Sequence, residues 1–255
     1  MQGKHSKYRN KKIIVNIILI IFIVVAIISG IVILKWVKEN KESKKIIEEI
    51  SSKVVVTEIA EDEEQSVQEK YKVDFNSLKQ INADTVSWIK IEGTEIEYPV
   101  VKAKDNSYYL NRSFNKTNNS AGWIFMDYRN SANGTDKNIV IYGHNRKDGS
   151  MFGTLKYVFE EEWYNNEKNK YITYITENEY CTYEIFSAYR IEAEDYYITT
   201  NFKSNTEFEQ FIKKIKSRSF KKFGIEVSAN DQILTLSTCS NANYRIAVHA
   251  KKIVE

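Results

Sequence analysis

Cysteine, histidine and proline are scarce in this chain of 255 residues, which has two Cys, three His and one Pro. The two cysteines, Cys181 and Cys239, can form at most one disulfide, so the chain is not a small secreted domain held together by disulfides. Neither a C-x-x-C nor an H-E-x-x-H motif is present, and the histidines His5, His144 and His249 are far apart. The sequence therefore gives no support to a metal site.

An excess of positive charge is also missing from most of the chain. Residues 1–70 hold 12 Lys and Arg against 10 Asp and Glu; since the totals are 37 and 34, the other 185 residues hold 25 and 24. A nucleic-acid-binding domain usually carries a basic excess. We therefore expect no nucleic acid among the partners of this protein.

One long segment lacks charged residues altogether. Residues 13–34 read IIVNIILIIFIVVAIISGIVIL, and a helix of that length spans roughly 33 Å, enough for a bilayer core of about 30 Å. A cleaved signal peptide would have a shorter apolar region of about 7–15 residues, followed by an A-x-A-like site, and no such site follows here. The sequence predicts a transmembrane anchor over residues 13–34.

The charges that flank this anchor do not decide its orientation. Five Lys and Arg lie within residues 4–12 and five Lys within residues 35–45. The orientation rule counts Lys and Arg, so the two flanks tie. Residues 35–73 are rich in Lys and Glu and include the acidic run 61–64, which favours a solvated, partly helical stalk.

From about residue 74 the pattern is that of a mostly β domain. A short helix over residues 74–81 comes first. Runs rich in Val, Ile, Tyr and Thr then predict about eight strands, hence a mostly antiparallel barrel or sandwich. Apolar spacing predicts a further helix over residues 207–217, with Thr206 and Glu209 placed for a capping box. The predicted strands are Val86–Ile91, Ile96–Val101, Trp123–Met126, Asn138–Tyr142, Tyr171–Thr176, Cys181–Arg190, Gln232–Thr238 and Tyr244–Ile253.

Two of these strands lead into residues capable of covalent chemistry. Cys239 follows an apolar run and precedes a polar loop, and His144 follows another run in the same way. Strand ends beside loops are where a rigid scaffold presents reactive groups. A free thiol is only a few per cent thiolate at pH 7, and a nearby imidazole stabilises the thiolate and protonates a leaving amine. Taken singly, each residue is more often structural.

Arg245 is the third candidate. A chain that folds back after Cys239 would bring Arg245 near the thiol, where its guanidinium could hold a carbonyl oxygen as it becomes negative. His249 lies four residues further along the same strand, roughly 13 Å away. We interpret His249 as structural, and likewise Cys181, which lies within a predicted strand.

Taken together, these motifs resemble those of class B sortases. The order His144, Cys239, Arg245, the segment TLSTC that ends at Cys239 and the segment RIAVHAK that begins at Arg245 are similar to the sortase signatures. Residues 84–101, 105–110 and 124–130, and the helix inserted before the Cys strand, are similar to class B members. The resemblance covers about residues 74–255.

The resemblance implies an architecture and a location. Residues 74–255 would form an eight-stranded, mostly β, sortase-like barrel with a few helices, which is the catalytic domain. A basic cytoplasmic tail (1–12), the transmembrane anchor (13–34) and the stalk (35–73) would precede it. The chain would cross a Gram-positive cell membrane once, with the catalytic domain outside.

The same resemblance implies an activity, that of a cysteine transpeptidase. Cys239 would attack a secreted protein after the Thr of a C-terminal sorting motif, NPQTN-like or (S/N)PxTG-like, and form a thioacyl-enzyme. His144 would move the proton and Arg245 would stabilise the oxyanion. An amine of the peptidoglycan cross-bridge would then accept the protein. Neither a metal nor a cofactor is implied.

Four further residues match positions that line the sortase substrate groove, and the resemblance implies that they bind substrate. Asn106 and Leu110 belong to a DNxxYL segment, while Tyr142 and Ser237 each precede a catalytic residue by two positions. One departure concerns Ser240, which stands where an acidic residue often follows the Cys.

Three alternatives differ in their sequence requirements. An L,D-transpeptidase also has the order His, Cys, Arg, but it places His and Gly directly before the Cys, where this chain has Ser237 and Thr238. A papain-like peptidase places Cys before His and would need His249. A barrel that only binds substrate would leave Cys239 unreactive.

Overall fold

The computed structural model of the chain describes residues 2–58, 69–192, 194–239 and 244–253. The chain divides into two compact units, Met1–Lys44 and Lys45–Glu255. Ser240 lies outside the described residues, so the departure at that position stays a sequence observation.

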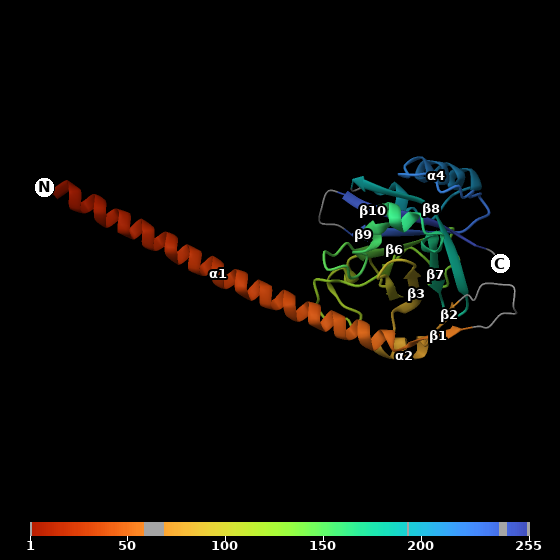
Figure 1. Cartoon of the computed structure of the whole chain (residues 1–255), viewed down its shortest axis with the longest axis horizontal. Coiled ribbons are helices and arrows are strands. Elements are labelled where there is room, and N and C mark those ends of the chain that lie inside the picture. Colours follow the sequence, from red (N-terminus) through yellow and green to blue (C-terminus); the bar gives the residue numbers. More distant parts are fainter. Residues whose placement is uncertain (1, 59–68, 193, 240–243, 254–255) are drawn as a thin grey trace. The chain divides into compact units, whose positions relative to one another are not determined.

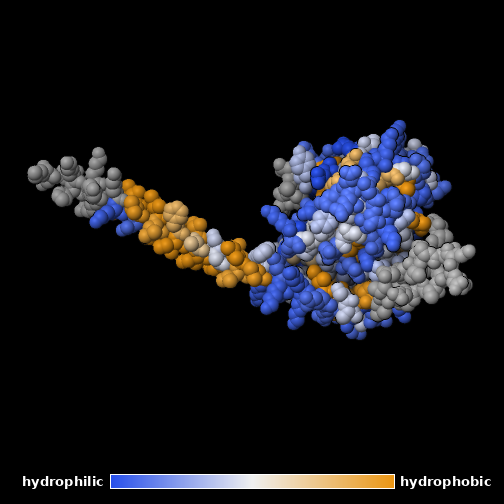
Figure 2. Space-filling model, viewed as in Figure 1, coloured by the Kyte–Doolittle hydropathy of each residue, from blue (hydrophilic) through white to orange (hydrophobic). Residues whose placement is uncertain are grey.

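The first unit consists of most of one long helix. Helix α1 runs over Gln2–Ser51, and the large apolar side chains of residues 13–34 are exposed along it. Figure 2 shows them as an almost unbroken hydrophobic stretch, whereas the face of the barrel in view is mostly hydrophilic. By length and composition α1 is able to cross a membrane.

The segment assigned to the stalk contains two strands that the sequence did not predict. Strands β1 (Val54–Glu58) and β2 (Glu69–Val73) form an antiparallel pair. Tyr71 of β2 packs against Trp88, with 5.3 Å between the ring centroids. The β-branched residues of VVVTE and the alternation in EKYKV are strand signals, but both segments lie within the region assigned to the charged stalk, around the acidic run 61–64.

The second unit is built on a closed barrel of eight strands, which confirms the predicted fold class (Figure 1). The closing order is β10-β8-β7-β3-β4-β5-β6-β9, and the pairs β4·β5 and β6·β9 are parallel. Its strands are β3 (Thr85–Ile91), β4 (Glu97–Val101), β5 (Phe125–Met126), β6 (Asn138–His144), β7 (Tyr171–Ile175), β8 (Tyr180–Glu192), β9 (Ile233–Cys239) and β10 (Tyr244–Lys252).

Both predicted helices are present. Helix α2 (Phe75–Ile81) is capped by Asp74, and α4 (Asn205–Ser217) is capped by Ser204, whose hydroxyl accepts from the amide of Glu207. The expected capping box at Thr206 and Glu209 was therefore wrong by two residues, because the chain already turns into the helix at Ser204. The remaining helical elements are η1 (Tyr108–Asn111), η2 (Leu155–Phe159), α3 (Glu161–Tyr164), η3 (Glu167–Lys170) and η4 (Tyr196–Ile198).

Alternation along the strands separates two apolar clusters. Leu234 and Leu236 of β9 face the barrel interior, whose core includes Val248 of β10. Ile233 of β9 lies instead in a cluster on the outer face, which includes residues of β8 and β10 and is covered by α4 and η4. The outer cover places η4 next to β9, the strand that ends at Cys239.

Candidate active site

The three candidate catalytic residues come together at one end of three neighbouring strands. In the parallel ladder of β6 and β9, His144 pairs with Cys239 as the last pair. In the antiparallel ladder of β9 and β10, Ser237 pairs with Ala247. The ladder ends with this pair, and continuing its register by two residues would bring Arg245 opposite Cys239. The backbone thus pairs His144 with Cys239, and Arg245 belongs to the neighbouring strand β10.

Short polar contacts hold this register near the site. Thr238 is fully buried and pairs with Gly143 of β6, and its hydroxyl accepts a 2.8 Å hydrogen bond from the amide of Ile246 in β10. A slip of one residue would turn every side chain of β9 to the opposite face. The buried Thr238 contact therefore fixes which residues flank the strand ends.

One ring nitrogen of His144 is already occupied. Its Nε2 lies 2.7 Å from the carbonyl oxygen of Leu110. A carbonyl oxygen only accepts, so Nε2 carries the proton and Nδ1 is the nitrogen left for proton exchange. The backbone carbonyl of Leu110 thus orients the His144 ring, whatever its side chain contacts.

Gly122 permits this close approach to His144. Its φ is 62°, and a Cβ at this position would lie 2.7 Å from Cδ2 of His144 and 2.8 Å from the carbonyl oxygens of Leu110 and Tyr109. Both the backbone conformation and the space therefore require glycine.

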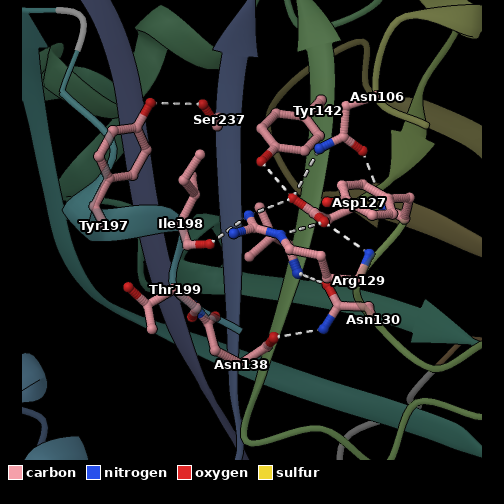
Figure 3. A network of polar contacts seen from close by, with 12 residues as sticks. Asn106, Asp127, Arg129, Asn130, Asn138, Tyr142, Tyr197, Ile198, Thr199 and Ser237 are labelled. Atoms are coloured by element: carbon pink, nitrogen blue, oxygen red, sulfur yellow. Dashed lines mark hydrogen bonds and ion pairs between the residues drawn. The ribbon is translucent and has the colours of Figure 1, made fainter. Parts of the chain in front are cut away.

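Two of the four residues expected to bind substrate meet at one buried carboxylate, that of Asp127 (Figure 3). The Tyr142 hydroxyl donates to its Oδ2 over 2.7 Å, and the Asn106 amide donates to the same oxygen over 3.0 Å. Ser237 lies apart from this group, and its hydroxyl lies 2.8 Å from that of Tyr197. Whether these residues bind substrate stays a prediction.

Asp127 and Arg129 are the members of this network that sequence reasoning missed. Arg129 donates to both oxygens of the Asp127 carboxylate, through Nε over 2.8 Å and through Nη2 over 2.7 Å. Its Nη2 also donates to the carbonyl oxygen of Ile198 over 2.9 Å. Both residues belong to the segment 124–130 quoted above, where an acid and an arginine two positions apart were the available signal.

The electrostatics of Asp127 follow from these contacts. Burial alone raises the pKa of a carboxyl group, but the hydrogen bonds from Arg129 and Tyr142 outweigh it, and the net pKa of Asp127 is lowered. Burial, followed by the charge of Asp127, raises the pKa of Tyr142. At neutral pH the network therefore contains a carboxylate, a guanidinium and a neutral phenol.

The two residues interpreted as structural are both buried. His249 is fully buried and lies 2.9 Å from both the Tyr189 hydroxyl and the Thr235 hydroxyl. Cys181 is 4% exposed, and burial together with Glu179 raises its pKa to about 11. Within the described part of the chain, no group of three or more His, Cys, Asp or Glu is arranged to hold a metal ion.

Comparisons with known proteins agree on one family. Residues 89–253 match the family model of the sortase domain. The chain is 39% identical over 202 residues to sortase B of Listeria monocytogenes, which covers 79% of each protein. A crystal structure of sortase B from Bacillus anthracis in complex with AAEK1 matches with a TM-score of 0.73 and 38% identity, over 86% of this chain and 99% of that one. A Staphylococcus aureus sortase B–substrate complex matches with a TM-score of 0.66 and 37% identity, over 70% and 84%.

Proposed function

The chain belongs to the sortase family as a class B sortase, a cysteine transpeptidase of cell-wall sorting, and on this premise we propose that His144, Cys239 and Arg245 carry its reaction. The observation that supports the proposal most is the register that makes His144 and Cys239 the last pair of β6 and β9. The register of β9 and β10, whose last pair is Ser237 and Ala247, would bring Arg245 opposite Cys239 if it is continued by two residues.

The proposed reaction begins with attack of the Cys239 thiolate on the carbonyl carbon after the Thr of a C-terminal sorting motif. The carbonyl electrons move to oxygen, and the Arg245 guanidinium stabilises the oxyanion. The imidazolium of His144 then gives a proton to the departing amine, and the C–N bond breaks to leave a thioacyl-enzyme. An amine of the peptidoglycan cross-bridge attacks the thioester, His144 takes its proton, and the thiolate is released.

The contacts of His144 support a particular nitrogen for this proton transfer. Because Nε2 donates to the carbonyl oxygen of Leu110, we assign the exchange to Nδ1. The same hydrogen bond orients the imidazole ring before substrate binds, which lowers the entropy cost of the proton transfer. Asn106, Leu110, Tyr142 and Ser237 are proposed to line the groove for the sorting motif.

The anchoring of the protein is part of the proposal. Sortases are enzymes of the cell envelope, and helix α1 is long and apolar enough to cross a membrane. We propose that α1 crosses the cell membrane once and that the barrel lies outside, where both the secreted protein and the peptidoglycan amine are available.

The test uses the full chain in detergent with a panel of NPQTN-like and (S/N)PxTG-like peptides. Cleavage after Thr in one class of motif, together with an acyl adduct on Cys239 found by mass spectrometry, is the expected result. Cys239→Ala should give neither, whereas Cys181→Ala should behave as the wild type and is the matched thiol control. A folded wild type that forms no adduct with any peptide would refute the proposal and favour a binding module.

A further inference from the structure

The Asp127 carboxylate connects parts of the barrel that are distant in sequence. It accepts five hydrogen bonds: three from Arg129, counting its backbone amide, and one each from Tyr142 and Asn106. Its side chain is fully buried, while that of Arg129 is 37% exposed. Asp127 thus joins the end of β5, the middle of β6 and the segment before η1.

Asp127 also fixes which way the Asn106 amide faces. The carboxylate only accepts, so the Asn106 group that faces it is the NH2, and the Asn106 oxygen accepts a 2.9 Å hydrogen bond from the amide of Tyr128. The reverse orientation would place two acceptors together and two donors together. The contacts given by the described residues use one N–H and one lone pair of Asn106, so the direction of the amide group is fixed.

Arg129 connects the same carboxylate to the outer cover of the sheet. Its Nη2 donates to the carbonyl oxygen of Ile198 in η4. The next carbonyl oxygen, that of Thr199, accepts a 2.8 Å hydrogen bond from the side-chain amide of Asn138. The preceding residue, Tyr197, is fully buried and contacts Ser237. Figure 3 shows that these contacts hold residues 197–199 beside the strands that carry Tyr142 and Ser237.

We propose that Asp127 and Arg129 are positioning residues for recognition of the sorting motif. Asp127 sets the direction of the Asn106 amide and of the Tyr142 hydroxyl. Arg129 holds residues 197–199 in place, and we infer that these residues form the other side of the proposed groove. The pair acts through these groups and takes no part in bond making. This inference rests on the proposed function, because Asn106 and Tyr142 are among the residues proposed to contact substrate.

Two conservative variants test the pair in the full chain. Asp127→Asn keeps the shape of the side chain but presents an NH2 group to donors, and Arg129→Lys keeps the charge but loses the planar fork that reaches both Asp127 and Ile198. The KM for the sorting peptide should rise about tenfold or more in each variant. The rate at which iodoacetamide alkylates Cys239 should stay within about twofold of the wild type.

A matched control lies at the far end of β9. The Asp231 carboxylate also accepts hydrogen bonds, from the amide and the hydroxyl of Ser228, and it lies 3.3 Å from the Lys251 ammonium. It precedes Cys239 by eight positions. Asp231→Asn should leave both KM and alkylation unchanged. An unchanged KM in both test variants would overturn the inference, and so would an equal loss of alkylation rate, because that would indicate general damage to the fold.

A second measurement does not depend on peptide turnover. Amide hydrogen exchange of residues 197–200 should become faster in Arg129→Lys than in the wild type, while exchange in β7 stays the same. Unchanged exchange of that segment would also overturn the inference. A different result separates this inference from the proposed function. If the wild type cleaves no peptide but exchange changes as expected in Arg129→Lys, the proposed function and the recognition of a sorting motif are both contradicted. Only the statement that Arg129 holds residues 197–199 in place would then stand.

Discussion

The buried His249 is expected to make the barrel less stable at mildly acidic pH, because its imidazole gains a proton in the unfolded chain but not in the folded one. Thr235 donates its single hydroxyl hydrogen to Asn138, so it can only accept from Nδ1 of His249, and Nε2 then accepts from Tyr189. The ring is surrounded by the aromatic rings of Phe186, Phe211, Tyr189 and Tyr197. The native contacts thus specify a neutral imidazole in one tautomer.

The size of the effect follows from the pKa of this imidazole. Burial lowers the pKa of His249 to about 3 in the folded chain, against about 6.5 in an unfolded chain. Because the folded pKa is depressed, the contribution to stability is fully present above pH 6.5 and is lost as the pH falls toward 3. At pH 4.5, about two units below the unfolded pKa, the loss is about 3 kcal/mol.

The assay is urea unfolding of the full chain in detergent, followed by tryptophan fluorescence, at several pH values between 8 and 4.5. His249→Gln removes the titrating group and keeps a donor and an acceptor, so the wild type should lose about 3 kcal/mol more than this variant over the interval. Carboxylates with a lowered pKa, such as Asp127, lose their contribution mainly below about pH 4 and act equally in both proteins.

Parallel loss of stability in the two proteins would refute this reasoning. If His249→Gln does not fold, NMR of the wild-type His249 imidazole as a function of pH tests the same reasoning. A signal of the neutral Nδ1–H tautomer that persists to pH 4.5 in the folded protein agrees with the structure, whereas protonation of His249 near pH 6 in the folded protein contradicts it.

Three further predictions concern the site itself. Gly122→Ala should lower kcat/KM at least about tenfold, because the added Cβ would lie 2.7 Å from the His144 ring; peptide cleavage by equal amounts of folded protein measures it. Arg245→Lys should lower kcat by about a hundredfold with a smaller change in KM, because a charge is kept but the planar fork is lost; single-turnover acylation measures it. At pH 8 iodoacetamide should label Cys239 and leave Cys181 unmodified, because burial and Glu179 raise the pKa of Cys181 to about 11; peptide mapping by mass spectrometry measures it.

Each of these predictions has a specific contradicting outcome. Gly224 has a φ of 80° with nothing within 4 Å of a Cβ, so Gly224→Ala carries the same backbone strain without the clash. An equal effect of the two glycine variants on kcat/KM would rule out displacement of His144 as the cause. Full activity of Arg245→Lys would exclude a bidentate role, and labelling of Cys181 at the rate of Cys239 would contradict its burial.

Local pattern was sufficient for the long helix, the eight barrel strands and the helices α2 and α4. An uncharged run of 22 residues predicts a spanning helix because a bilayer core has a fixed thickness. Alternation and β-branched residues predict the eight barrel strands because each strand must bury one face. The same patterns did not reveal β1 and β2, whose pairing depends on packing such as that of Tyr71 on Trp88.

The site divides in the same way. His144, Cys239 and Arg245 were identifiable because each belongs to a short motif whose residue types carry the chemistry. The closeness of Arg245 to Cys239 was expected from the short connection between them, and that of His144 only from the resemblance, since β6 and β9 are parallel neighbours separated by almost ninety residues of chain. The Asp127 network was hidden for the same reason: it depends on burial and on donors from three residues, Asn106, Arg129 and Tyr142, and only the closed barrel determines which distant groups share one carboxylate.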